Sequence, residues 1–405
     1  VKATLDALKE DGLYDDTIVI YNSDHGGVMA RSKRFLYSSG VHCPLIVRIP
    51  EKLKHLYPAE KPGMTVDRLV SFVDMPKTWL SLAGAEIPNT YQGTIFLGKH
   101  QEPEPRYHVG FRERADERLD CVRLIRDGRF AYHINYMPYA PAGQHLAYLW
   151  KAPATPAWEQ HHREGKTNEI TGRFFRPRVS EEFYDNDNDF DNVHNLIDSP
   201  EHQERIQQMK VALRERQLAL YDSGLLPEKM RERRAAKNNV TIYEMVRNQD
   251  LYPLEQYLDA ADLALERNES NVSKFIEQMS DTDEGMRWWA VVGLHLLADK
   301  APQSDKVHAA EPVLKRALND THEVRMMAAW TLVKLGKSDD SLATLDALLF
   351  SETTDASNHI MLHNVLDWMG EPAFPLVKKY IQNAGDRQGQ YGIGILGRIA
   401  ELNGW

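Results

Sequence analysis

An internal repeat in the last third of the chain is the feature that most constrains the fold. The run Met286–Leu294 recurs as Val324–Leu332, and the arginines of the two copies, Arg287 and Arg325, stand 38 positions apart. A weaker third copy runs from near His359 to Gly370, and an aspartate precedes each copy: Asp283, Asp320 and Asp355. Because one helix pair cannot bury its apolar face alone, a repeat of this length predicts stacked helix pairs.

The pattern from Leu254 to the end is helical throughout, so we expect an all-α domain over residues 251–405. Its period and its Asp…Val-Arg…Ala-x-x-x-Leu-x-x-Leu-Gly pattern resemble HEAT-like repeats. The resemblance implies a domain whose main role is packing. A dedicated surface for a protein partner or another ligand is the alternative.

The first hundred residues show a different pattern, in which predicted helices and strands alternate. Val1, Leu5 and Leu8 lie at helical spacing, and a β-branched run over 17–21 predicts a buried strand. A second apolar run covers 44–49, and residues 66–83 are typical of a helix. This alternation favours an α/β domain with an open, mostly parallel sheet.

The middle of the chain predicts a smaller antiparallel α+β subdomain. Two short strands, 121–125 and 130–134, flank Asp127-Gly128, which is a hairpin signal. We expect a long ordered loop over 138–171, a solvated acidic loop over 182–196 and a charged helix over 200–221. The basic stretch 228–239 is interpreted as a linker or an exposed helix. The predicted domains are 1–105 (α/β), 106–222 (subdomain), 223–250 (charged linker) and 251–405 (repeats).

Composition limits the function. The net charge is -10, which argues against general nucleic-acid binding, because that needs clustered cations. An anionic ligand would therefore need a local basic pocket. No run of 18 apolar residues is present, so no membrane span is expected. The two cysteines, Cys43 and Cys121, make neither a disulfide framework nor a zinc cluster.

One cluster of residues suggests metal chemistry. Asp24-His25-Gly26 follows the first predicted strand, at the edge of an α/β sheet where ligands bind. An aspartate and an adjacent histidine can reach one metal ion if the chain turns sharply, and Gly26-Gly27 permits such a turn. The same three residues also occur in ordinary turns.

The order of further motifs resembles the second half of the type I sulfatases, in the alkaline-phosphatase superfamily. Ser-Asp-His-Gly is followed by Lys33-x-x-x-Tyr37-x-x-Gly40, then by proline and an apolar strand. Later matches are an Asp-containing helix over 69–80, the hairpin at 126–132, and Glu-Phe-Tyr-Asp through Asn195-Leu196. The resemblance covers about residues 1–222.

The resemblance implies roles for particular residues. Asp24 and His25 match the last two ligands of a calcium ion, Lys33 matches the lysine that contacts the sulfate oxygens, and Tyr37 and Gly40 match structural positions. Where the family often has arginine, this chain has His42. The family's nucleophile is a formylglycine made from Cys or Ser in a Cys/Ser-x-Pro/Ala-x-Arg motif. Neither cysteine fits that motif, so we expect it upstream of this chain, which we interpret as an inactive fragment that opens within a helix.

Residues that would contact substrate are proposed from charge. His108, Arg112 and Arg114 are candidates for binding a sulfated glycan or small sulfate ester, with a solvated strand edge as the alternative. The aromatic loop 135–150 is expected either to stack on sugar rings or to pack against the repeats. A phosphatase or phosphonate-ester hydrolase of the same superfamily and a non-catalytic interaction protein are the alternative functions. Family resemblance points to a periplasmic or extracellular location.

Overall fold

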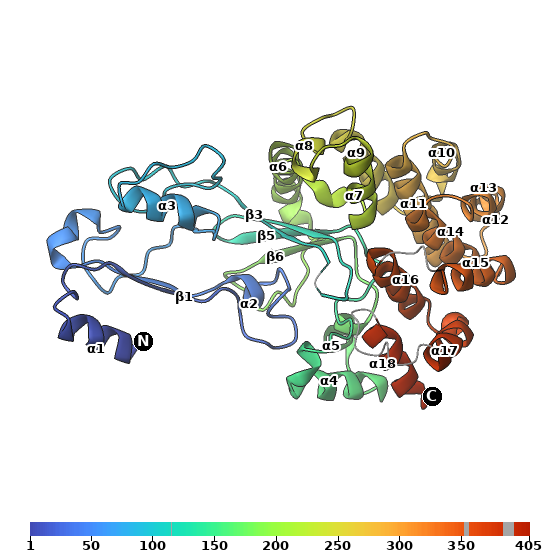
Figure 1. Ribbon diagram of the computed structural model, residues 1–405, viewed down its shortest axis with the longest axis horizontal. Coiled ribbons are helices and arrows are strands. Elements are labelled where there is room, and N and C mark those ends of the chain that lie inside the picture. The colour runs from blue at the N-terminus through green and yellow to red at the C-terminus, as the bar shows by residue number, and fades with distance from the viewer. Residues whose placement is uncertain (115, 352–355, 384–392) are drawn as a thin grey trace. The chain divides into compact units, whose positions relative to one another are not determined.

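The computed structural model describes residues 1–114, 116–351, 356–383 and 393–405. It divides into two compact units. Unit 1 comprises Val1–Gly110, Arg123–His133 and Glu182–Ala212, and unit 2 comprises Phe111–Val122, Ile134–Glu181 and Leu213–Trp405. The fold class is confirmed: small sheets with helices come first, and a helical domain follows (Figure 1). The domain boundaries proposed from the sequence stay predictions.

Unit 1 opens with helix α1 (Lys2–Glu10) and a two-stranded sheet made of β1 (Val19–Asn22) and β2 (Leu45–Arg48). The two strands are antiparallel, with Tyr21 opposite Ile46 and Asn22 opposite Leu45. The predicted parallel arrangement is therefore wrong for this pair. The reason is the connection between the strands. Residues 23–44 contain only the four-residue helix α2 (Ser38–Val41), and β2 starts beside the residue at which β1 ends. Parallel strands would need a crossover that carries the chain back to the start of β1.

Helix α3 (Asp74–Leu82) covers one face of this sheet (Figure 1). Its Met75, Trp79 and Leu82 pack with β2 around the buried residues Ile49, Phe96 and Leu97. The helix begins at Asp74 and not near Val66 as predicted. The Asp74 carboxylate accepts the N–H of Ser71 at 2.8 Å and of Thr94 at 2.7 Å, and Pro76 is tolerated only in a first turn. A 3₁₀ helix, η1 (Glu51–Leu56), precedes it.

The second sheet has the order β3 (His108–Arg112), β4 (Val122–Arg126), β5 (Phe130–Asn135), β6 (Glu181–Asp185). The predicted hairpin between β4 and β5 is confirmed: the Asp127 carboxylate accepts the N–H of Arg129 at 2.9 Å and of Phe130 at 2.6 Å. The solvated loop predicted over 182–196 is wrong in its first part. Phe183 and Tyr184 are buried in β6, because β5 provides a partner strand that the local sequence does not show.

The chain between β5 and β6 is not the long loop that the sequence predicts. It contains η2 (Leu149–Lys151), α4 (Ala154–Arg163), α5 (Glu169–Gly172) and η3 (Arg173–Phe175). Proline does not prevent α4, since Pro153 lies at the N-cap and Pro156 in the first turn, where N–H groups have no partner within the helix. Two histidines and an arginine lie in its last turn, where positive charge interacts favourably with the negative end of the helix dipole.

The rest of the chain is helical. The charged helix predicted over 200–221 is confirmed as η4 (Pro200–His202) and α6 (Gln203–Leu220). The remaining elements are η5 (Ser223–Leu225), α7 (Glu228–Lys237), α8 (Ile242–Met245), α9 (Leu254–Leu265), η6 (Glu269–Asn271), α10 (Val272–Gln278), α11 (Glu284–Lys300), α12 (Asp305–His308), α13 (Glu311–Ala317), α14 (His322–Lys334), α15 (Asp339–Leu349), α16 (Ala356–Met369), η7 (Glu371–Ala373), α17 (Phe374–Asn383) and α18 (Ile393–Asn403). None of the helices in the described part of the chain is long and apolar enough to cross a bilayer.

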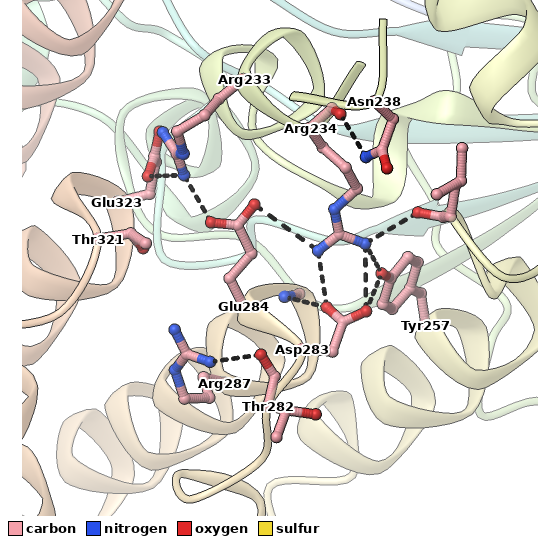
Figure 2. Close-up of polar contacts among 12 residues, drawn as sticks. Arg233, Arg234, Asn238, Tyr257, Thr282, Asp283, Glu284, Arg287, Thr321 and Glu323 are labelled. Carbon is pink, nitrogen blue, oxygen red and sulfur yellow. Dashed lines mark hydrogen bonds and ion pairs between the residues drawn. The ribbon is translucent and has the colours of Figure 1, made fainter. Parts of the chain in front are cut away.

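The repeat prediction is confirmed, because the recurring motifs form α11, α14 and α16, which pack in series. An ion pair joins the first two copies: both Nε and Nη2 of Arg287 lie 2.7 Å from the carboxylate of Asp320. Arg234 of α7 bonds Asp283, the aspartate before the first copy, through contacts of 3.1 and 2.8 Å (Figure 2). Asp355, the aspartate of the third copy, lies outside the described residues.

Helix α7 confirms the helical alternative for residues 228–239, but its arginines are not simply exposed. Arg233 binds Glu323 through two hydrogen bonds of 3.1 and 3.0 Å and also bonds Glu284 at 2.7 Å (Figure 2). The side chain of Glu323 is fully buried. The basic residues of 228–239, for which a linker was one interpretation, therefore supply the arginines of a partly buried ion-pair network. Local charge alone does not predict this role.

The aromatic loop after β5 packs on the repeats. The ring of Tyr136 lies 5.9 Å from that of Trp289, and the ring of Tyr139 contacts His295, Trp330 and Trp368 at 5.4 to 5.6 Å. All these residues belong to unit 2. Of the two alternatives for this loop, packing is the one observed for these tyrosines.

Candidate active site

The candidate site begins where β1 ends, as the sequence predicts. Asn22 is the last residue of β1, and Asp24 and His25 follow after one residue. The Asp24 side chain is 85% exposed and that of His25 is 28% exposed. The Ser23 hydroxyl donates to the backbone carbonyl of His25 at 2.7 Å, which fixes the turn. The sheet thus presents both side chains outward from one short segment.

The two side chains lie close enough to each other to serve as two ligands of one cation. His25 Nδ1 contacts the Gly26 carbonyl, which can only accept a hydrogen bond, so in the neutral imidazole Nδ1 carries the proton and Nε2 has the lone pair. Nε2 lies 3.4 Å from Oδ2 of Asp24. Two ligand atoms about 2.4 Å from one ion and at right angles to each other are about 3.4 Å apart. The pair therefore fits one cation.

These two residues supply only part of a coordination shell. Within the described residues, no group of three or more His, Cys, Asp or Glu side chains is arranged to hold a metal ion. A calcium site needs roughly six to eight oxygen ligands. Burial and then the Asp24 carboxylate raise the pKa of the Cys43 thiol.

Two glycines make the loop after His25 compact. A Cβ added at Gly26 would lie 2.0 Å from the carbonyl oxygen of Ser39, and one at Gly40 would lie 2.2 Å from that of Phe35. Gly26 N–H also donates to the Gly40 carbonyl at 3.2 Å. Only glycine allows this approach of backbone to backbone. Gly40, which the sequence places among the structural positions, has a purely steric role.

Lys33 lies in a strained part of this loop. Its backbone N–H donates to the Gly27 carbonyl at 3.1 Å, and two neighbours, Arg31 and Arg34, have φ angles of +61° and +83°. Positive φ is uncommon for residues other than glycine and persists only where the surroundings enforce it. The conformation that presents Lys33 is thus held by other contacts.

Residues 191–192 provide those contacts. The Arg31 guanidinium donates to the carbonyls of Asp191 at 3.0 Å and Asn192 at 2.9 Å, and it lies 4.1 Å from the ring centroid of Tyr37. The side chain of Asn192 accepts the N–H of Ser38 at 2.7 Å. The loop is therefore clamped from both sides of Lys33 by a segment far away in the sequence.

Tyr37 connects the loop to the second sheet. Its hydroxyl donates to Glu182 at 3.2 Å, and Tyr184 donates to the same carboxylate at 2.6 Å. The ring of Tyr37 stacks on that of His133 with 5.6 Å between centroids. Burial lowers the pKa of His133 to about 4, partly opposed by the Glu182 carboxylate. Sequence reasoning assigned no role to Glu182, His133 or Asn192; the late Glu-Phe-Tyr-Asp…Asn-Leu motif was the only signal for this region.

The lowered pKa of His133 makes unit 1 sensitive to acid. In the unfolded chain this imidazole titrates near pH 6.5. Between that pH and the lowered pKa of the folded state, the unfolded state therefore binds a proton that the folded state does not bind. We expect the free energy of unfolding to fall by about 1.4 kcal/mol per pH unit from pH 6.5 towards pH 4 through this group alone. Urea unfolding across this range, with His133→Phe beside the wild type, measures the slope. An equal slope in the variant would contradict the assignment.

Two of the three residues proposed to contact substrate, His108 and Arg112, are the first and last residues of β3, and Arg114 follows that strand. The Arg112 side chain is 5% exposed and pairs with Asp120 at 3.1 Å, while Arg114 binds Glu228 through two contacts of 2.5 and 3.1 Å. Burial alone would raise the pKa of Asp120, but Arg178 and Arg112 hold it below its usual value. Contact of these residues with substrate stays a prediction.

Two family models match the chain. Residues 1–85 match the sulfatase model, and residues 261–357 match the model of the HEAT repeats. The first match contains Asp24, His25 and Lys33 with the loop between them, and the second contains α11 and α14. Residues 1–85 are therefore similar to sulfatases and residues 261–357 to HEAT repeats, as the motifs predict.

Individual relatives agree with the family. An ulvan-active sulfatase of Formosa agariphila is 35% identical over 230 residues, which are 56% of this chain and 37% of that protein. An N-acetylglucosamine-6-O-sulfatase of Bacteroides thetaiotaomicron is 34% identical over 93 residues, 22% of this chain and 15% of that protein. A solved structure in complex with its substrate D-glucosamine-2-N,6-O-disulfate has a TM-score of 0.37 and 22% identity, covering 53% of this chain and 37% of that one. The chain spans little more than a third of the length of the first curated relatives it matches.

Proposed function

We propose that this chain is the C-terminal part of a sulfuric-ester hydrolase that acts on a sulfated glycan. The observation that carries the proposal is the Asp24–His25 pair, whose ligand atoms lie 3.4 Å apart at the end of β1, within the segment that matches the sulfatase family. Two relatives support the substrate class, since one is an ulvan-active sulfatase and another is an N-acetylglucosamine-6-O-sulfatase. The remaining ligands and the formylglycine belong, in this proposal, to a part of the protein outside this chain.

The residues present fit a calcium ion as partial ligands. Asp24 supplies a carboxylate oxygen, which suits a hard cation, and His25 supplies the lone pair of Nε2. When bound, such an ion would stabilise negative charge on the sulfate oxygens. Lys33, held in its strained loop, would donate to the same oxygens and offset the charge that develops as the ester bond breaks. We further propose a periplasmic or extracellular location, and a packing role for the repeats that leaves room for a protein partner.

The substrate class is tested on the full-length gene product that contains this chain, with an aryl sulfate and the matched aryl phosphate. We expect faster turnover of the sulfate. Faster turnover of the phosphate would instead favour the phosphatase alternative. DNA sequence upstream of the Val1 codon provides a second test, since the proposal requires a Cys/Ser-x-Pro/Ala-x-Arg motif there.

Lys33→Ala tests the lysine. We expect the turnover number with the aryl sulfate to fall by about 10²–10³-fold, the usual cost of removing one group that stabilises charge in the transition state. Lys61→Ala, which removes an exposed lysine of the same unit, is the control and should leave turnover unchanged. A wild-type rate for Lys33→Ala would show that the lysine has been assigned wrongly.

A further inference from the structure

Unit 2 contains a cavity of about 200 Å³ whose lining does not include Asp24, His25 or Lys33, but does include Arg114, one of the three residues proposed from charge to contact substrate. Its walls come from three stretches of chain outside the repeats and from three repeat helices. The stretches lie within residues 113–121, 136–139 and 224–231, and the helices are α11, α14 and α16. The described residues of all six belong to one compact unit, so the cavity is formed within a single body.

Five aromatic side chains line the cavity: Tyr136, Tyr139, Trp288, Trp289 and Trp368. The indole N–H of Trp289 donates to the Leu225 carbonyl at 2.9 Å, and both tyrosines contact tryptophan rings of the repeats edge to face. Aromatic side chains held in this way give the cavity an apolar lining at little further cost in conformational entropy.

The cations of the lining are each paired with a carboxylate, beginning with Lys229, which bonds Glu232 at 3.1 Å. Arg114 is held by Glu228 through two contacts, and Arg231 bonds Glu113 at 2.9 Å and the Ser223 hydroxyl at 2.9 Å. The two buried carboxylates of the lining, Asp120 and Glu323, are paired with arginines that approach from outside the cavity: Arg112 and Arg178 for the first, and Arg233 for the second.

This pairing of charges determines which kind of ligand the cavity can bind. A sulfate or carboxylate would have to displace the carboxylates that already occupy these guanidinium groups, which is costly in a partly buried site. A hydroxyl group can instead donate to a remaining carboxylate lone pair without breaking an ion pair. A sugar ring combines such hydroxyls with an apolar C–H face that packs on an aromatic wall. The cavity is smaller than the roughly 300–1,000 Å³ of sites for drug-sized ligands, which favours a single ring.

We propose that this cavity binds one uncharged sugar residue of a glycan, with Trp288 against the ring and the Arg114–Glu228 pair facing its hydroxyls. The proposal rests on the proposed function in one respect: the sugar is taken to belong to the glycan that carries the sulfate ester. Binding itself requires no hydrolysis. The site would hold the polymer through an unsulfated residue while sulfate is removed elsewhere.

The experiment measures binding and not turnover. The intrinsic tryptophan fluorescence of the full 405-residue chain is titrated with methyl glycosides of a neutral hexose, a 6-deoxyhexose and a pentose, and with inorganic sulfate. Because three tryptophans line the cavity, a bound sugar should change their emission. We expect saturable binding of at least one neutral glycoside in the millimolar range typical of weak ligands, about −4 kcal/mol, and no saturation with sulfate.

Variants locate the binding. Trp288→Ala and Glu228→Gln should each weaken the sugar affinity by tenfold or more, and Trp405→Ala, which removes a tryptophan outside the cavity, should not. If Trp288→Ala fails to fold by circular dichroism, Glu228→Gln decides alone. Absence of saturation with every neutral glycoside, preference for sulfate, or wild-type affinity in Glu228→Gln would each overturn the proposal. Lys33→Ala separates the two ideas, since it should lower sulfate-ester turnover in the full-length protein by about 10²–10³-fold and leave sugar binding in this chain unchanged.

Discussion

Replacing Asp24 by alanine in the full-length protein should remove the bound calcium and lower sulfate-ester turnover by at least about 10²–10³-fold. The reason is geometric. Asp24 supplies the carboxylate oxygen of a pair whose second member, His25, is oriented by the Gly26 carbonyl. Without the carboxylate, a single imidazole remains at the end of β1, and imidazole is a poor ligand for a cation that prefers oxygen. Elemental analysis after dialysis measures the metal, and an aryl sulfate assay measures turnover.

The control for this prediction is Asp11→Ala, which removes an exposed carboxylate at the end of α1 and should leave both readings unchanged. Thermal unfolding with and without added calcium gives a reading that does not depend on activity. Wild type should gain stability with calcium because only the folded state binds it, and Asp24→Ala should gain none. Full calcium content in the variant would refute the role of Asp24.

The sequence predicts those features that depend on neighbouring residues. The repeat motifs, the Asp127 hairpin and the turn at Asp24-His25 each rest on spacing or on turn chemistry within a few positions, and all three are found where expected. Features that depend on distant partners are missed. Phe183 and Tyr184 look like part of an acidic loop until β5 lies beside them, and α7 looks like a linker until Glu284 and Glu323 approach it.

The same contrast between neighbouring and distant residues holds for the candidate site. Asp24, His25 and Lys33 can be nominated from one short segment, because that segment resembles a family motif. The residues that hold the segment cannot, because Asn192 and Glu182 reach it from more than a hundred positions away. Arg112 was proposed to contact substrate because of its charge. That charge does not indicate that Arg112 pairs with Asp120 in the interior. Local sequence thus indicates which groups could carry chemistry, and tertiary contacts decide which of them are presented.

Arg233→Ala should cost about 3–5 kcal/mol of stability, because it removes the partner of a buried charge. The Glu323 side chain is fully buried, and both of its carboxylate oxygens accept hydrogen bonds from Arg233 (Figure 2). A second interaction of Arg233, with Glu284, would be lost at the same time. Urea unfolding followed by circular dichroism at 222 nm measures the loss, since most helices of the chain lie in unit 2.

Two further variants show whether the buried charge is the cause. Arg214→Ala breaks ion pairs with Asp259 and Asp262, whose side chains are 67% and 54% exposed, so it should cost at most about 1 kcal/mol. Adding Glu323→Gln to Arg233→Ala should restore part of the stability, because a neutral amide is much less costly to bury alone than a carboxylate. Equal losses for Arg233→Ala and Arg214→Ala, or no recovery in the double variant, would mean that the network contributes no more than surface pairs do. The large difference expected here follows from burial alone, since all these interactions join arginine to a carboxylate.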